Sequence, residues 1–279
     1  QNGEVIYSEI PQGFHHKYNP KHWLWLLLKT CYGLKQASYE FWRQLLEAMK
    51  NLLFKRSNAD PCLYTKWTDH GLNIWISWVD DLIAIGPKDD IVKNKEQFKK
   101  HFECEDVGWL DEYVGCKIDI DRNKRKLKYT QPVLIQSLHD EFDLPEKEYH
   151  TPAEPGQVLS QSDEGDILNP KIQTLYRSGV GKLIHLMRWS RPEIYNAVRE
   201  LTMHLGKCNE VHLKAMKRTM RYCTTTPKRG WQILPKRIWD GIDKDFLFKM
   251  IGLPDASFAK CKRTRRSVTG INMLFEGVV

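Results

Sequence analysis

The sequence predicts an α+β fold, and three observations lead to this class. Residues 73–79 and 82–85 are apolar runs rich in β-branched and aromatic side chains, which are typical of buried strands. Apolar residues between Ser38 and Phe54 recur with helical spacing, which indicates a helix with one apolar face. Further helical patterns follow a segment rich in proline and glycine at 144–171. We therefore expect a core that contains both sheet and helices.

The elements of the first 143 residues follow from apolar spacing and from turn residues. Proline and glycine punctuate residues 1–36, which hold one apolar strand at 23–28. Ser38 is predicted to cap the helix that ends at Phe54. Beyond the strand pair, the patterns predict a helix at 91–102, strands at 112–121 and 126–131, and a helix at 132–142.

The second half of the chain is predicted to be mainly helical. Residues 144–171 read as a linker because proline and glycine lie among polar residues there. Pro192 falls in the first turn of a helix, where proline is tolerated. The predicted helices are 172–189, 191–206 and 210–224. Strand-like runs return from Trp231 onward.

Composition narrows the class of protein. The formal net charge of +8 suits a polyanionic partner, but charge alone favours the alternative, a generic solvated basic surface. No apolar run is long enough to span a membrane, and the N-terminus lacks both an initiator Met and a signal-peptide pattern, so we expect a truncated start. Seven cysteines without a Cys-x-x-Cys pair argue against a zinc ribbon or a disulfide framework. We expect reduced thiols in an intracellular protein.

The pair Asp80-Asp81 falls at the turn between the two predicted strands. Adjacent acids at a buried strand end are costly unless a cation neutralises them, and Mg²⁺, or Mn²⁺ in its place, is the usual partner of carboxylates and phosphates together. This pattern points to metal-assisted phosphoryl chemistry. The alternative is a polar β-turn, since Asp is common in turns.

Four motifs precede or include this pair. They are Ile10-Pro-Gln-Gly-Phe14, Cys31-Tyr-Gly-Leu-Lys-Gln-Ala37, Asp60-Pro-Cys-Leu-Tyr64 and Trp78-Val-Asp-Asp81. In this order and spacing they resemble the reverse transcriptase of copia-type long-terminal-repeat retrotransposons. Further matching motifs lie at 106–110, 113–118, 176–183, 191–194, 254–259 and 265–270. The resemblance therefore covers nearly the whole chain.

The resemblance implies a division into segments. Residues 1–143 would form a reverse transcriptase palm-like sheet with helices, with the fingers and the first catalytic motif truncated. Residues 144–171 would be a linker, and 172–228 a helical thumb or connection segment. Residues 229–279 would be the N-terminal part of an RNase H-like domain, a truncated β segment.

The resemblance also assigns catalytic and metal-binding residues. Asp80 would be a metal ligand and Asp81 a second contact, both catalytic. In the family, a second Asp on an upstream strand shares the metal, and the motif of that strand ends in a pattern like Asn2-Gly3. This second Asp is therefore expected before residue 1. This chain alone is then expected to be inactive. Asp255 matches the first metal-binding carboxylate of the RNase H site, whose other acids are expected after residue 279.

Substrate contacts are implied at two further places. Gly33, Lys35 and Gln36 resemble the box beneath the templating base and the incoming sugar, where a glycine lets backbone approach the nucleotide. The alternative is a helix-entry turn with a solvated Lys35. Trp78 stands where the family has Tyr, beside the primer terminus, which puts fidelity and competence in doubt.

A basic stripe is predicted on the helix at 210–224. Its members are Lys214, Lys217, Arg218 and Arg221. The stripe would either be a solvated charged face or follow a nucleic-acid backbone, and the sequence favours neither.

The function implied is that of an RNA-directed DNA polymerase fragment of a retrotransposon polyprotein. Its partners would be an RNA template, a DNA primer, deoxynucleoside triphosphates and other parts of the polyprotein. No membrane partner is expected. The family places it in a cytoplasmic particle, with the nucleus as an alternative. The competing hypothesis is a degenerate, non-catalytic relic that at most binds nucleic acid. An unrelated Mg²⁺ phosphotransferase is a third, and it lacks a glycine-rich phosphate loop.

Overall fold

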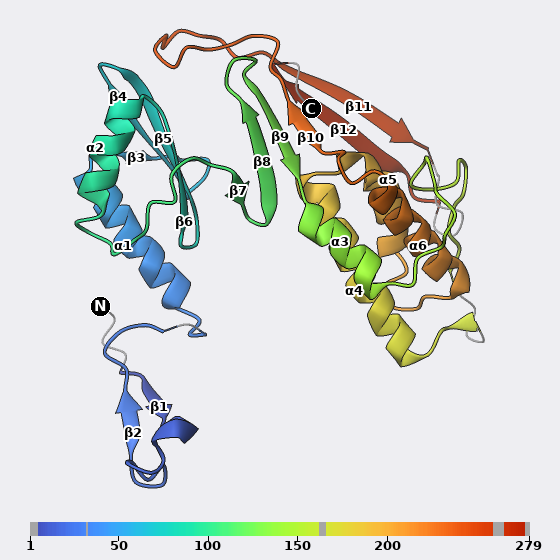
Figure 1. Ribbon diagram of the computed structural model, residues 1–279, viewed down its shortest axis with the longest axis horizontal. Helices are drawn as coiled ribbons and strands as arrows, with labels where there is room; N and C mark the ends of the chain where they lie inside the picture. Colours follow the sequence, from blue (N-terminus) through green and yellow to red (C-terminus); the bar gives the residue numbers. More distant parts are fainter. Residues whose placement is uncertain (1–4, 32, 162–165, 259–264, 277–279) are drawn as a thin grey trace. The chain divides into compact units, whose positions relative to one another are not determined.

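The computed structural model describes residues 5–31, 33–161, 166–258 and 265–276. Contacts within the chain define two compact units (Figure 1). Unit 1 comprises residues 1–106 and 239–245, and unit 2 comprises 107–238 and 246–279. Both units combine helices with sheet, which agrees with the predicted α+β class. In the described part of the chain, no helix is both long enough and apolar enough to cross a membrane.

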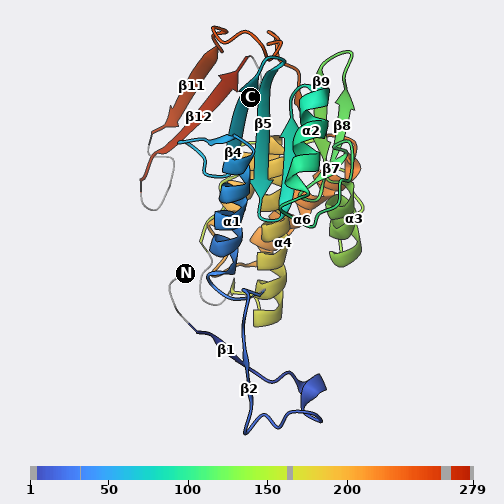
Figure 2. The same cartoon turned by 90° about the vertical axis from the view of Figure 1, so that its left-hand side faces the viewer.

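The centre of unit 1 is an antiparallel sheet covered by two helices (Figures 1 and 2). Its strands are β3 (Lys55–Arg56), β4 (Leu63–Thr68), β5 (Gly71–Trp78) and β6 (Asp81–Ile85), in the order β3-β4-β5-β6. Every second residue of β5 is buried, as expected when one face of a strand meets the core. That face packs through Trp75 against Phe98 of α2 (Lys88–Phe98) and joins Leu45 and Met49 of α1 (Ala37–Asn51) in one apolar cluster.

The first helix ends earlier than predicted at its C-terminus, and it also begins two residues earlier. It runs from Ala37 to Asn51, with Gln36 rather than Ser38 at the N-cap position. Leu53 has φ +65°, and the N–H of Phe54 donates to the Met49 carbonyl at 2.9 Å. A residue in the left-handed region followed by this backward hydrogen bond is the Schellman ending of a helix, so the apolar spacing continues past the point where the helix stops.

Two other predicted elements also change at their ends. The helix predicted at 91–102 is α2 at Lys88–Phe98, because Asp89 and Asp90 occupy its first turn, where negative charge is favoured. The strand predicted at 112–121 is divided into β7 (Glu112–Tyr113) and β8 (Cys116–Asp121). Val114 and Gly115 both have positive φ, which makes the two-residue turn of a hairpin.

The N-terminal part of unit 1 is a small hairpin. Strand β1 (Tyr7–Glu9) pairs with β2 (Leu24–Leu26), which lies within the strand predicted at 23–28. A short 3-10 helix, η1 (Gln12–Phe14), follows β1. The ring of Phe14 meets that of Trp25 edge-on at 5.0 Å between centroids. The patterns did not predict β1 because its three residues are too few to show a period.

Unit 2 contains a second antiparallel sheet and a helical core. The sheet order is β10-β9-β8-β7, in which β10 (Trp231–Ile233) pairs with β9 (Lys126–Thr130). The helices are α3 (Pro132–Glu141), α4 (Pro170–Trp189), α5 (Tyr195–Thr202) and α6 (Glu210–Thr225), with the 3-10 helix η3 at Pro192–Ile194. They enclose an apolar cluster. The helix predicted at 191–206 is thus η3 followed by the shorter α5.

These units divide the chain at Asp106 and Val107, whereas the sequence places its first boundary after residue 143. Residues 107–143 belong to the same compact unit as the later helices, and β10, from the segment beyond 228, completes their sheet. The palm, thumb and RNase H assignments of these segments stay predictions. The predicted linker at 144–171 forms no strand in its described residues, yet Leu159 is buried in the helical core.

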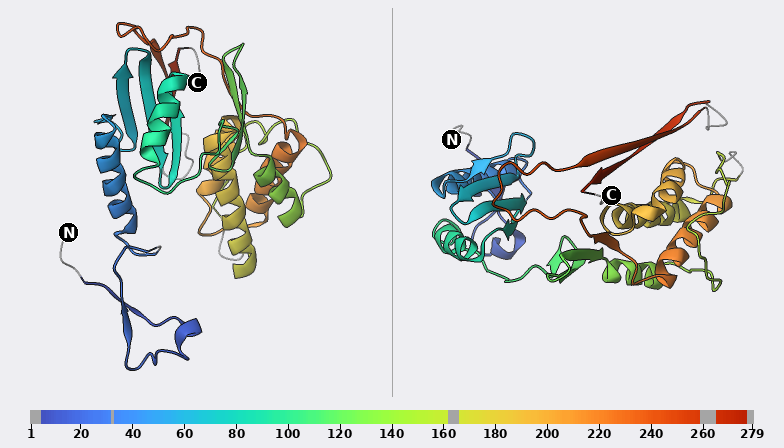
Figure 3. Two further views of the ribbon diagram at one scale, coloured as in Figure 1. Left: turned by 60° about the vertical axis from the view of Figure 1, so that its left-hand side comes forward. Right: turned by 90° about the horizontal axis from the view of Figure 1, so that it is seen from above.

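Two further features lie near the C-terminus. Strands β11 (Met250–Ser257) and β12 (Val268–Phe275) form a two-stranded antiparallel hairpin, drawn in red in Figure 3. Residues 239–245, called here the return segment, belong to unit 1. The Gly241 carbonyl accepts the Leu72 N–H at 2.9 Å, and the ring of Trp239 meets Trp67 edge-on at 6.0 Å. The return segment therefore packs on the β4–β5 hairpin.

Candidate active site

The predicted carboxylate pair lies at the tip of the β5–β6 hairpin. In the strand register Trp78 faces Asp81, so Val79 and Asp80 form the two-residue turn. Val79 has φ +54°. A β-branched side chain is strained in this left-handed region, and such strain persists only where the surrounding structure holds the backbone in place. The pairing of β5 with β4 and β6 supplies that constraint.

All four tip residues are solvent-exposed. Trp78 keeps 51% of its surface exposed and Val79 keeps 56%, while Asp80 and Asp81 are also in the exposed class. The expectation of a buried strand end is therefore wrong for the carboxylates, although Trp75, five residues before Asp80, is buried. The two acids are accessible to an ion or a substrate from solvent.

The ligand set of the hairpin consists of two adjacent carboxylates. Among the described residues, no group of three or more His, Cys, Asp or Glu side chains is arranged to hold a metal ion. Carboxylate oxygens are the donors that Mg²⁺ prefers, and Mg²⁺ commonly binds one or two carboxylates together with water and substrate phosphates. The hairpin fits that partial type of site rather than a closed protein cage.

The predicted substrate box lies at the start of α1. Gly33 has φ +95°, a conformation that favours glycine, and the Ala37 N–H donates to the Leu34 carbonyl at 3.1 Å as the chain enters the helix. Lys35 is exposed and Gln36 is half-buried. The structure therefore places these residues on a turn before a helix, as both interpretations of the box require. Their contact with a nucleotide stays a prediction.

Asp255 lies in a different part of the chain from the pair. It is in β11 opposite Gly270 of β12 and is exposed. The described residues bring no cluster of metal-ligating side chains around it. Its assignment to an RNase H site stays a prediction.

Most of the predicted basic stripe on α6 is engaged with the segment that precedes α4. The Arg218 guanidinium donates to Glu154 and to Thr151, each at 3.0 Å. The Lys217 ammonium lies 3.2 Å from the Asp143 carboxylate. The Arg218 contacts fasten the predicted linker to the helix, and the Lys217 contact fastens the residue just before that linker.

The remaining members of the stripe differ from one another. Arg221 donates to the Glu146 carbonyl at 3.1 Å, whereas Lys214 is exposed. The sequence left open a solvated charged face or a nucleic-acid contact, and Lys217, Arg218 and Arg221 instead contact groups of the protein itself. Nucleic-acid binding stays a prediction, with Lys214 as the most accessible member.

One polar cluster was not predicted, and it anchors α2 to the sheet of unit 1. The Asp90 carboxylate accepts hydrogen bonds from Thr68 at 2.5 Å and Asn73 at 3.1 Å, and it lies 3.1 Å from a ring nitrogen of His70. The hydrogen bonds from Thr68, Asn73 and His70 lower the pKa of Asp90 to about 2 against the opposing effect of burial. The same pair raises the pKa of His70. The sequence gave no sign of this role, because Asp90 lies just before the helix predicted at 91–102 and becomes the third residue of α2 only in the structure.

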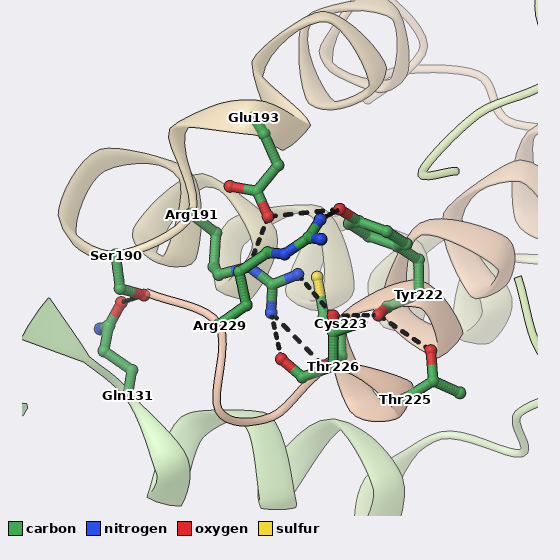
Figure 4. A network of polar contacts seen from close by, with 9 residues as sticks. All are labelled: Gln131, Ser190, Arg191, Glu193, Tyr222, Cys223, Thr225, Thr226 and Arg229. Carbon is green, nitrogen blue, oxygen red and sulfur yellow. Dashed lines mark hydrogen bonds and ion pairs between the residues drawn. The ribbon is translucent and has the colours of Figure 1, made fainter. Parts of the chain in front are cut away.

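A second unpredicted network surrounds Arg191, a member of a motif to which the sequence gave no role (Figure 4). Its side chain is fully buried. Nε donates to Glu193 at 2.6 Å, Nη2 to the Thr226 hydroxyl at 2.7 Å, and Nη1 to the Thr226 carbonyl at 3.1 Å. The guanidinium also lies over the Tyr222 ring at 5.3 Å. Arg191 therefore joins the start of η3 to the C-terminal end of α6.

Retrotransposon Pol polyproteins are among the known proteins that the chain resembles. The chain is 31% identical over 229 residues to the retrovirus-related Pol polyprotein from transposon TNT 1-94 of Nicotiana tabacum. It is 29% identical over 227 residues to that from transposon RE1, and 25% identical over 231 residues to that from transposon RE2, both of Arabidopsis thaliana. These matches cover 80%, 81% and 81% of the chain, respectively.

The chain spans only a small part of these relatives, 17% of the tobacco polyprotein and 15% of each Arabidopsis polyprotein. No solved structure matches it. A family model described as reverse transcriptase (RNA-dependent DNA polymerase) matches residues 2–155, more than half of the 279 residues, and includes the β5–β6 hairpin. The chain therefore belongs to the reverse transcriptase (RNA-dependent DNA polymerase) family, in its copia-type retrotransposon branch, as its motif order predicts.

Proposed function

We propose that the β5–β6 hairpin is the catalytic tip of an RNA-directed DNA polymerase that works by two-metal nucleotidyl transfer. The observation that carries the proposal is the exposed Asp80-Asp81 pair on a constrained turn inside the family match. Template RNA, primer DNA and deoxynucleoside triphosphates would be the partners, within a polyprotein that acts in a cytoplasmic particle. The mechanism assigned to the hairpin rests on the chemistry of its side chains.

The carboxylates fit a divalent metal by their donor chemistry. Asp80 and Asp81 offer hard oxygen ligands side by side and reach solvent, so they can bind Mg²⁺ or Mn²⁺ while substrate phosphates complete the coordination. When bound, the metal would stabilise the charge that develops on the attacking and leaving oxygens during phosphoryl transfer. The strained Val79 backbone would fix the direction of both acids before substrate arrives.

The neighbouring residues would position the substrates. Trp78 presents an exposed indole beside the acids, and a flat aromatic ring of this kind can stack on a base or sugar at the primer end. Gly33 has no side chain to hold a nucleotide away from the backbone, and Lys35 is exposed to attract phosphate. Gln36 would supply a polar contact at the start of α1.

Terbium luminescence tests the metal site directly. Tb³⁺ binds oxygen ligands and is sensitised by a nearby indole, so excitation of Trp78 should produce Tb³⁺ emission that Mg²⁺ or Mn²⁺ displaces. We expect Asp80→Asn and Asp81→Asn to weaken Tb³⁺ binding, and Trp78→Phe to remove emission without changing Mg²⁺ affinity. Asp89→Asn, which removes an exposed acid from α2 in the same unit, is the matched control. Equal emission from the parent chain and Asp80→Asn would contradict the proposed site.

Primer extension tests the reaction. We expect a longer segment of the natural polyprotein to extend a DNA primer on an RNA template with Mg²⁺ or Mn²⁺, and Asp80→Asn to abolish extension while Asp89→Asn does not. Extension that survives Asp80→Asn would contradict the catalytic role. The non-catalytic relic predicts a different pattern, in which primer-template binds with a salt dependence but no variant or metal produces extension.

A further inference from the structure

The N-terminal hairpin of unit 1 carries a surface to which the polymerase proposal gives no role. Between Glu9 and Glu40 the sequence contains neither Asp nor Glu. The same stretch contains the basic residues Lys17, Lys21, Lys29 and Lys35 and the histidines His15, His16 and His22. Glu40, the acid that ends the stretch, is already paired with Arg43 at 2.9 Å. The local charge is therefore positive and not neutralised from within the stretch.

Exposed aromatic rings lie among these charges. Trp23 keeps 59% of its surface exposed and Tyr7 keeps 61%. The rings of Tyr18 and Trp23 meet edge-on at 6.2 Å between centroids, and the Lys17 ammonium lies 5.5 Å from the centroid of the Tyr18 ring. Exposed aromatic rings that lie beside ammonium groups offer faces on which nucleic-acid bases can stack.

The loop that carries these side chains has a defined backbone. The Tyr18 N–H donates to the Phe14 carbonyl at 2.9 Å, and the Trp23 N–H donates to the Asn19 carbonyl at 3.0 Å. The Asn19 side chain also accepts from the Lys21 N–H at 3.0 Å. Elsewhere in the hairpin, the rings of Phe14 and Trp25 meet edge-on. The backbone that carries the lysines and rings is thus ordered before any partner binds, which lowers the entropy cost of binding.

We propose that this surface, formed by Lys17, Tyr18, Lys21 and Trp23, binds single-stranded RNA. Ammonium groups interleaved with aromatic rings match a polymer in which phosphates alternate with stacking bases. The choice of RNA rests on the proposed function, since an RNA-dependent polymerase works on that polymer, but binding at this hairpin requires neither a metal ion nor synthesis. The site would hold the strand separately from the Asp80-Asp81 tip.

Fluorescence anisotropy with a labelled oligouridine, in EDTA and over a series of salt concentrations, tests the proposal on the full chain. We expect Trp23→Ala to weaken binding about tenfold, because stacking of one base contributes about 1–3 kcal/mol. Trp23→Phe should keep most of the affinity. Lys17→Ala/Lys21→Ala should reduce the slope of log affinity against log salt by about 1.4, or about 0.7 for each lost phosphate contact.

Matched controls separate this surface from general charge. Lys99→Ala/Lys100→Ala removes two exposed lysines after α2 and should leave both affinity and slope unchanged. Asp80→Asn should also leave RNA affinity unchanged, so loss of the metal site and loss of this surface give different results. Circular dichroism of each variant confirms that the exposed substitutions leave the fold intact.

Four outcomes would overturn the proposal. The first is an absence of oligouridine binding at low salt, and the second is equal weakening by the Lys99/Lys100 control. The third is an affinity indifferent to Trp23→Ala, which would reduce the surface to a charge effect. The fourth is tighter binding to vesicles that contain phosphatidylserine than to RNA, with the same variants weakening it. That result would identify an anionic lipid surface as the partner instead.

Discussion

Replacement of Arg191 tests whether unit 2 depends on its buried guanidinium. The side chain is fully buried and uses all three of its nitrogens on Glu193 and Thr226. Removing one partner of a buried ionic network costs about 3–5 kcal/mol, because the groups left behind lose their hydrogen bonds. We therefore expect Arg191→Ala to lower the free energy of unfolding by about that amount. Arg191→Lys keeps the charge but loses the planar fork, and it should cost about 2–3 kcal/mol.

The acid of the pair supplies the control. The Glu193 side chain is 33% exposed, so water can solvate the groups that Glu193→Gln leaves unpaired, and we expect a cost of only about 1 kcal/mol. Urea unfolding followed by tryptophan fluorescence and by circular dichroism measures all three variants, since Trp189 lies two residues before Arg191. The reasoning fails if Arg191→Ala costs less than about 1 kcal/mol, or if Glu193→Gln costs as much as Arg191→Ala.

Three further predictions concern unit 1. The pKa of Asp90 is lowered to about 2, so its carboxylate stabilises the fold above its ordinary pKa near 3.8, and this stabilisation is lost as the pH falls from about 4 toward 2. Urea unfolding across this pH range should show a steeper loss of unfolding free energy for the parent chain than for Asp90→Asn. Gly71→Ala should lower the melting temperature, since its Cβ would lie 2.8 Å from the Gly241 carbonyl oxygen and φ is +128°; an unchanged melting temperature would show that this contact does not persist in solution. Leu53→Gly should raise the free energy of unfolding by up to about 1 kcal/mol, because Leu53 is strained at φ +65° and mostly exposed. A lower free energy of unfolding for this variant, measured with urea, would show instead that the Leu53 side chain contributes packing.

The sequence predicts those parts of the fold whose cause is local. The alternation along β5 and the apolar stripe of α1 are visible in the residues themselves, because each reflects one face against a core. The end of α1 was missed because Leu53 adopts a conformation that usually selects glycine. The pairing of β10 with β9 joins residues about a hundred positions apart, and no local period reports such a contact.

In the candidate site too, features with a local cause were predicted and features that depend on distant residues were not. Asp80 and Asp81 were placed at a turn correctly, because a polar pair between two apolar runs marks a strand end. Their exposure was not predicted, since the extent of a core depends on which residues other elements bring to it. The engagement of Arg218 with Glu154 was equally hidden, because a charged side chain on a helix face looks the same in sequence whether its partner is protein or nucleic acid.

The return segment makes unit 1 a discontinuous domain. Its carbonyl at Gly241 satisfies the Leu72 N–H, yet the chain reaches that position only after completing the helices of unit 2. The family match ends at residue 155, so a fragment cut at that boundary would lose the Trp67–Trp239 ring contact and leave the Leu72 N–H without the Gly241 carbonyl. Proteolytic processing or gene truncation between the two stretches would consequently weaken a sheet whose own strands remain whole.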